Sequence, residues 1–142
     1  MKKLLFRILL ALVAVFVLIQ LVPVNHPNPP VTQDIGAPPQ VEAILRTSCY
    51  DCHSNETRRP WYSHVAPTSW LLAHDVKRGR ALMNFSRWDT YSKEMRAGFP
   101  ERIYGMVSGD LMPPFQYLLM HRDAKLDSQK LEMLKEWKES NN

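Results

Sequence analysis

The chain has three parts with different hydrophobic patterns: an apolar run, a proline-rich stretch, and a longer region with helical periodicity. The apolar run extends over residues 8–24, is interrupted only by Gln20 and Pro23, and follows three basic residues. Counted from Leu4, about 20 residues are available, enough to cross a bilayer. Residues 1–24 are therefore predicted to form a single transmembrane helix with its basic end in the cytoplasm.

A cleaved signal peptide is the alternative for this segment, because such peptides also place an apolar stretch after basic residues. Its usual cleavage site, two small residues separated by one other, is missing from the end of the run, which reads I-Q-L-V-P-V. An uncleaved anchor in the cytoplasmic membrane is therefore favoured. With either interpretation, the rest of the chain is expected on the periplasmic, extracytoplasmic side.

Residues 25–39 form a proline-rich linker, since six of the 11 prolines lie between Pro23 and Pro39. Proline fixes the backbone in an extended conformation that spans about 3.1 Å per residue. The segment is expected to act as a semi-rigid stalk.

Residues 40–142 show apolar positions near the helical period, and no run in which apolar and polar residues alternate. We expect Gly98 and Pro100 to split the third helical segment, and Asp127 to cap the last one. The fold class is therefore predicted to be all-α, a small domain around one cofactor. Four segments carry the pattern: 41–52, 68–83, 88–107 and 128–137.

The net charge of +4 does not indicate a nucleic-acid surface. Three of the 18 basic residues lie in the N-terminal segment, and the other 15 nearly balance the 14 acidic residues. The basic residues after the anchor are scattered rather than gathered in a stripe, so nucleic acid is not expected as a partner.

The only two cysteines, Cys49 and Cys52, are followed directly by His53. The pattern C-x-x-C-H is the attachment signature of a c-type haem. Two thiols three residues apart match two neighbouring vinyl groups, and the histidine lies beneath the iron as the proximal ligand. The sequence therefore predicts one covalent haem c, with Cys49 and Cys52 attached to the cofactor and His53 on the iron.

Met112 is the preferred candidate for the second iron ligand. It lies in a short irregular segment before Pro113 and Pro114, which restrict the loop, and it follows His53 by 59 residues. Methionines on helical patterns are usually core residues, and the histidines are expected to make local or surface contacts. The other candidates are His26, His64, His74, His121, Met83, Met95, Met106, Met120 and Met133, of which His64 and His74 are the main rivals.

Other aromatic and basic residues have two interpretations each. The four tryptophans could line a haem crevice, but in a small domain they are usually core. Four arginines could pair with haem propionates, although surface solvation is common for such residues. These residues are Trp61, Trp70, Trp88, Trp137, Arg58, Arg59, Arg78 and Arg80.

The motifs together resemble the haem-binding domain proteins of bacterial envelopes, which belong with the c-type cytochromes. The resemblance implies one covalent haem on Cys49 and Cys52 with His53 proximal, and its Met-Pro pair is similar to the distal loop of class I cytochromes c. No defined reaction comes with it. The matching stretches are C-Y-D-C-H-S-N at 49–55, P-W-Y at 60–62, P-T-S-W at 67–70, D-V at 75–76, G-R at 79–80, N-F-S-R-W at 84–88 and M-P-P-F-Q-Y at 112–117, with His121.

The expected function is that of a membrane-anchored, one-electron carrier with His/Met-ligated iron, rather than an enzyme. Its partners would be redox proteins near the membrane. A haem enzyme or a gas or redox sensor with a labile distal ligand is the main alternative. A haem-free thiol or metal module is a third, although zinc usually requires four ligands.

Overall fold

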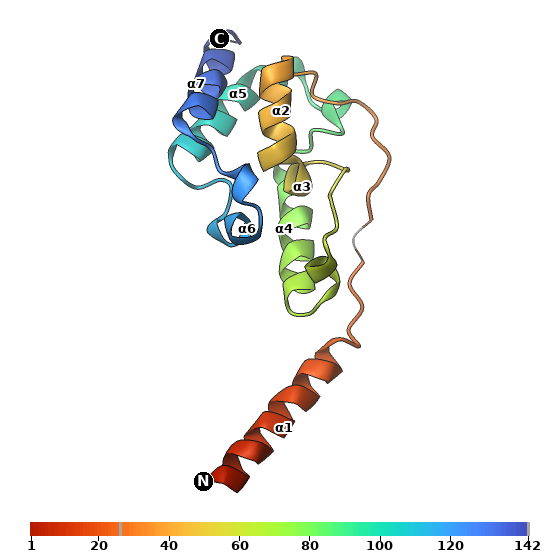
Figure 1. Ribbon diagram of the computed structural model, residues 1–142. Coiled ribbons are helices and arrows are strands. Elements are labelled where there is room, and N and C mark those ends of the chain that lie inside the picture. The colour runs from red at the N-terminus through yellow and green to blue at the C-terminus, as the bar shows by residue number, and fades with distance from the viewer. Residues whose placement is uncertain (26, 142) are drawn as a thin grey trace.

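The computed structural model describes residues 1–25 and 27–141, and within these residues all regular structure is helical (Figure 1). A single bridge between Gln33 and Arg87 is the only β-type pairing found there. The prediction of an all-α fold is confirmed. The helices are α1 (Lys2–Ile19), α2 (Pro39–Ser48), α3 (Tyr50–His53), α4 (Thr68–Leu82), α5 (Lys93–Ser108), α6 (Phe115–Met120) and α7 (Ser128–Glu139), with short 3-10 helices at Trp61–His64, Trp88–Thr90 and Arg122–Ala124.

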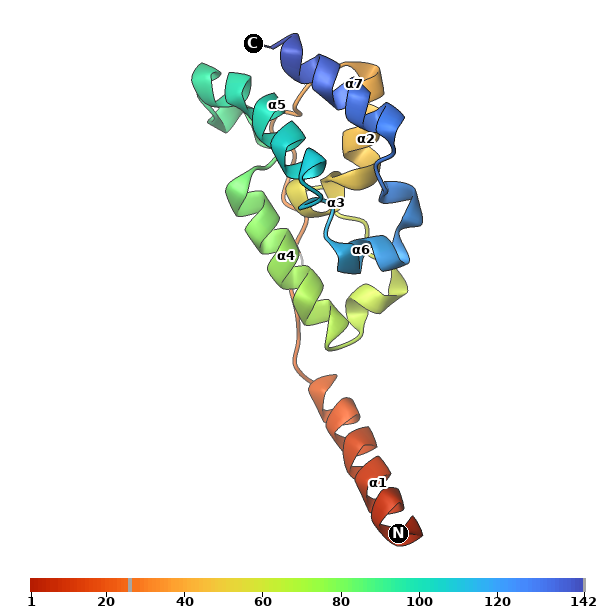
Figure 2. The same ribbon diagram turned by 90° about the vertical axis from the view of Figure 1, so that its left-hand side faces the viewer.

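Helix α1 extends away from the other helices in both views (Figures 1 and 2), and none of its residues is buried. It meets the rest of the chain through Gln20, the residue that follows it. The Gln20 side chain accepts a hydrogen bond from the Ala66 amide at 2.9 Å and donates one to the Ala66 carbonyl at 3.1 Å.

The prediction of a transmembrane helix over residues 1–24 is corrected. Helix α1 ends at Ile19, before Pro23, and its 18 residues begin with Lys2 and Lys3 and include Arg7. An 18-residue helix rises about 27 Å, and its charged first turns reduce the apolar part further. In the part of the chain that the structure describes, no helix is both long and apolar enough to cross a membrane.

The proline-rich segment lies against the domain from Pro27 onward and does not stand free as a stalk. The Arg80 guanidinium donates a 2.7 Å hydrogen bond to the Pro27 carbonyl, and the Asn55 amide donates a 2.9 Å bond to the Pro30 carbonyl. Farther along, Ile35 is buried in the hydrophobic core. This segment is therefore packed as part of the folded unit.

Helices α2, α5 and α7 pack around the core, together with Phe85 and the 3-10 helix that begins at Trp88. Helix α5 is continuous through Gly98 and Pro100, so the prediction that these residues split it is wrong. Phe99 is fully buried, and later apolar residues of the same helix are buried too, so packing outweighs the lost backbone hydrogen bond.

Two other local predictions have clear outcomes. Asp127 caps α7, because its carboxylate accepts a hydrogen bond from the Lys130 amide at 2.8 Å. The segment predicted as one helix running into the cysteine motif is two helices, α2 and α3, which meet at Cys49. The single turn of α3 therefore holds most of the cysteine motif.

Candidate functional site

A cavity of about 410 Å³ lies among α3, α4, α5 and the loop before α6. This volume is within the range of cofactor pockets, which are concave and mostly apolar. The apolar part of its lining consists of Leu82, Met83, Phe85, Phe99, Ile103, Met106, Val107, Met112, Pro113 and Pro114.

The structure brings all four sequence-predicted site residues, Cys49, Cys52, His53 and Met112, to the lining of this one cavity. Cys49 and Cys52 are free thiols at the two ends of one helical turn. Burial raises the pKa of each thiol to about 12. Both groups are therefore protonated near neutral pH, unlike the reactive thiols of redox modules, whose pKa values are lowered.

His53 has the hydrogen bonding of a metal-ligating histidine. Its Nδ1 lies 3.0 Å from the Met83 carbonyl oxygen, and because a carbonyl only accepts, Nδ1 must carry the proton. The other nitrogen, Nε2, then keeps its lone pair. Burial lowers the pKa of the ring, which keeps it neutral. A fixed tautomer with one free nitrogen is the form in which histidine binds metals.

Helix α4 approaches the cysteine motif closely at Gly79. A methyl group built at Gly79 would clash with the Cys52 carbonyl oxygen and would lie 3.2 Å from the Cys52 Cβ atom. Gly79 is buried and also lines the cavity. The absence of a side chain here allows α3 and α4 to form one continuous wall.

The loop before α6 carries Met112 and is held at its start by the end of α5. The backbone amides of Leu111 and Met112 both donate to the Met106 carbonyl, at 3.0 and 3.2 Å. Met83 and Met106 also line the cavity. Met83 packs against the hydrophobic core as well, as its helical spacing indicated, whereas Met106 is exposed.

The remaining ligand candidates lie elsewhere. Met95 and Met120 are exposed, and Met133 packs against the hydrophobic core. The three described histidines other than His53 are absent from the lining of the cavity: His64, His74 and His121. His26 lies outside the described residues.

The tryptophans do not line the cavity within the described part of the chain. Trp88 and Trp137 are buried in the core, whereas Trp61 is 74% exposed. The core interpretation therefore holds for Trp88 and Trp137.

Arg58 and Arg80, two of the arginines that the sequence singled out, have partners within the protein. Arg58 pairs with Asp51, and Arg80 donates to the Ser54 carbonyl at 2.7 Å. Arg78 and Arg102 line the cavity instead. The sequence singled out Arg78 but missed Arg102. The only signal for Arg102 was its place on the same helical face as Phe99, and its guanidinium lies over the Phe99 ring.

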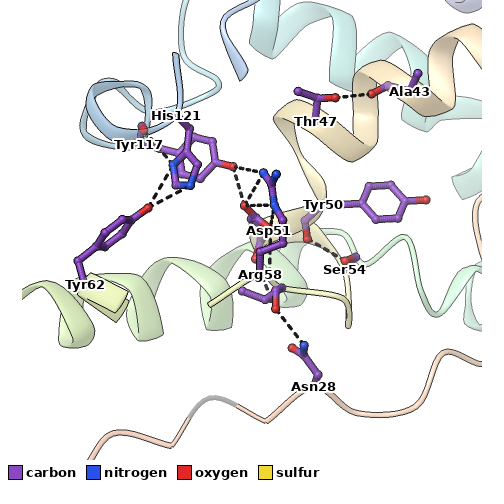
Figure 3. A network of polar contacts seen from close by, with 11 residues as sticks. Asn28, Ala43, Thr47, Tyr50, Asp51, Ser54, Arg58, Tyr62, Tyr117 and His121 are labelled. Atoms are coloured by element: carbon purple, nitrogen blue, oxygen red, sulfur yellow. Dashed lines mark hydrogen bonds and ion pairs between the residues drawn. The ribbon is translucent and has the colours of Figure 1, made fainter. Parts of the chain in front are cut away.

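A polar network surrounds the buried Asp51, the residue directly before Cys52 (Figure 3). The Asp51 carboxylate accepts hydrogen bonds from the Arg58 guanidinium at 2.9 Å and from the Tyr117 hydroxyl at 2.7 Å. Burial alone would raise the pKa of Asp51, but the hydrogen bonds from Arg58 and Tyr117 outweigh it and lower the pKa. Asp51 is therefore an ionised acceptor.

The network continues from Tyr117 to His121 and Tyr62 (Figure 3). The rings of Tyr117 and His121 stack with their centroids 4.1 Å apart, and His121 Nε2 lies 3.0 Å from the Tyr62 hydroxyl. His121 Nδ1 also contacts the Tyr117 carbonyl at 3.3 Å, which is the local contact expected for it. Tyr62 and His121 are 59 residues apart in the sequence, and Asp51 and Tyr117 are 66 apart. Neither contact left a signal in the sequence.

A family model described as a haem-binding domain matches residues 14–140 of the chain. No curated protein is significantly similar to this chain. No solved structure matches the chain either.

Proposed function

We propose that this chain, which belongs to the haem-binding domain family, holds one haem in the 410 Å³ cavity. The family match confirms the resemblance that the motifs indicated. We further propose that the haem is covalently attached to Cys49 and Cys52, with His53 on the iron. One observation carries the proposal: both thiols and an imidazole with one free nitrogen line the same apolar cavity.

The attachment chemistry suits thiols that remain protonated. Each thiol would add across a vinyl double bond, with sulfur bonding to one carbon and the thiol hydrogen ending on the other. No electrons are gained or lost, so no oxidant is needed. The arrangement supports this chemistry, because Cys49 at the start of α3 and Cys52 within it both line the cavity.

Met112 is proposed as the second axial ligand. It lines the cavity and lies between the backbone tether to Met106 and two prolines that limit the motion of the loop. When bound, the haem iron supplies one-electron chemistry, and two protein ligands leave no position for substrate. The protein is therefore proposed to be an electron carrier with His/Met-ligated iron.

Arg78 and Arg102 are proposed to bind the haem propionates. They lie on different helices, both line the cavity, and neither forms an ion pair among the described residues. Guanidinium groups bind carboxylates in paired hydrogen bonds. Two cations at this mostly apolar cavity, which Asp51 and Asp75 also line, would help orient the cofactor, because only one of its edges is charged.

The haem domain is proposed to lie on the extracytoplasmic side of the cytoplasmic membrane, where c-type attachment takes place. The exposed apolar side chains of α1 and its basic first turns support a contact with lipid. Redox proteins near the membrane surface are the proposed electron donors and acceptors.

The test is an absorption spectrum of the full chain produced with c-type maturation machinery. The haem should stay with the protein through acid–acetone extraction, and its release would refute covalent attachment. Replacing His53 with Ala should abolish stable low-spin haem, and a normal spectrum of that variant would refute the proximal assignment.

The distal ligand is tested with two methionine variants. Met112→Ala should lose the weak far-red sulfur-to-iron band of the ferric protein. Met106→Leu is the matched control, because it removes another thioether from the same cavity and should keep the band. Loss of the band only in Met106→Leu would refute Met112 as the ligand. Peroxidase activity in the unmodified protein would favour the alternative of a haem enzyme.

A further inference from the structure

Helix α6 follows directly on the loop that carries Met112, yet apolar packing does not hold it in place. None of its six residues is buried, and Phe115 and Leu119 are 70% and 59% exposed. The tether between Met112 and the Met106 carbonyl fixes only the start of the loop. Because α6 buries no apolar side chain fully, polar contacts have a large part in fixing the loop's other end.

The hydrogen bond between Tyr117 and Asp51 supplies this second attachment. Tyr117 lies in the first turn of α6, where its amide donates to the Pro114 carbonyl at 3.0 Å. Its hydroxyl donates to Asp51 Oδ2 at 2.7 Å and accepts from Arg58 at 3.3 Å. The bond thus connects α6 directly to the helical turn that contains Cys52 (Figure 3).

Asp51 is itself held firmly, so it can serve as a fixed point. Its Oδ1 accepts from the Arg58 backbone amide at 3.0 Å and from Arg58 Nε at 3.1 Å. Hydrogen bonds to a charged group are stronger than those between neutral groups. Pro113 and Pro114 lie between Met112 and α6 and restrict the backbone there, so a shift of α6 moves Met112 instead of being absorbed.

From this geometry, and resting on the proposed ligation by Met112, we propose that Tyr117 is a positioning residue for the distal ligand. Its hydrogen bond to Asp51 joins the proximal wall of the cavity to the distal loop, and so determines how strongly Met112 binds the iron. Asp51 thus has a role of its own within the C-x-x-C-H motif.

The test measures the affinity of the haem-loaded full chain for imidazole, which competes with Met112 for the ferric iron. Tyr117→Phe removes the hydroxyl and keeps the ring, and should raise the imidazole affinity about tenfold, as expected for the loss of a hydrogen bond to a charged group. Tyr62→Phe is the matched control. Its hydroxyl contacts His121 in the same network but not Asp51, so its affinity should stay within about twofold of wild type.

A double-mutant cycle with Met112→Ala separates this inference from the proposed function. Met112→Ala should itself raise imidazole affinity, and if it does not, the proposed ligation fails. In the Met112→Ala background, Tyr117→Phe should add no further increase, since no distal ligand remains to be positioned. Equal increases in both backgrounds would overturn the positioning role, as would a Tyr117→Phe protein that melts earlier but binds imidazole like wild type.

Discussion

Replacing Gly79 with Ala adds one methyl group where α4 lies in close contact with Cys52 of the C-x-x-C-H motif. Gly79 is buried, and the added Cβ would clash with the carbonyl oxygen of Cys52 and lie 3.0 Å from its carbonyl carbon. Both sides of this contact are backbone, so no flexible side chain can move aside. The two helices must therefore separate, and the cavity wall must open.

Two opposing effects set the size of the loss. Alanine is favoured over glycine inside a helix by about 1 kcal/mol. Overpacking in a tightly packed site costs about 1–3 kcal/mol, and a contact with backbone on both sides belongs at the upper end of that range. The expected net destabilisation is about 1–2 kcal/mol, which lowers the melting temperature of a domain this size by roughly 5–10 °C.

The assay is thermal unfolding of the haem-loaded chain, followed by circular dichroism, with Gly98→Ala as the matched control. Gly98 is also inside a helix, but a methyl group there meets no atom within 4 Å. That variant should be stabilised by about 0.5–1 kcal/mol. If Gly79→Ala melts at or above the temperature of Gly98→Ala, the close approach of α4 to Cys52 is wrong.

Three further variants test interactions that stabilise the fold. Phe85→Ala should lose about 3–5 kcal/mol in urea unfolding, because Phe85 is fully buried with its ring 6.0 Å from that of His53; a loss below about 1 kcal/mol would contradict its place in the core. Asn84→Ala should cost about 1–3 kcal/mol, since it leaves the buried Asn55 amide oxygen without its 2.9 Å donor; an unchanged unfolding midpoint would show that bond to be absent. Asp127→Ala should cost about 1 kcal/mol through loss of the α7 cap, measured by the same method, whereas Asp127→Asn should retain most of the stability.

The grouping of Cys49, Cys52 and His53 at one cavity could be predicted from the sequence, because these residues are neighbours along the chain. Cys49, Cys52 and His53 lie within one turn, so their spacing alone carries the chemical information. The hydrogen bond of His53 to the Met83 carbonyl could not be predicted, because backbone acceptors leave no residue-type signal. The role of Gly79 could not be predicted either, because it depends on how closely its own helix, α4, approaches Cys52.

The course of the helices was partly predictable. The apolar period located α4 and α7 within a few residues, since each buries one regular face. It failed at Pro100, where packing of α5 overrides a local helix breaker, and at α6, which has no buried face to produce a period. The polar network on Tyr117 joins residues that are 66 positions apart, a distance at which hydrogen bonds leave no pattern in one sequence.

The packing of the segment before α2 determines where an independently folding fragment of this chain must begin. A fragment cut at residue 40, the first residue of the sequence-predicted domain, would lose Ile35 from the core and would leave Asn55 without its Pro30 acceptor. It would also free the Arg80 guanidinium from the Pro27 carbonyl. The smallest piece that keeps these contacts therefore starts at residue 27, thirteen residues earlier than helical periodicity alone indicates.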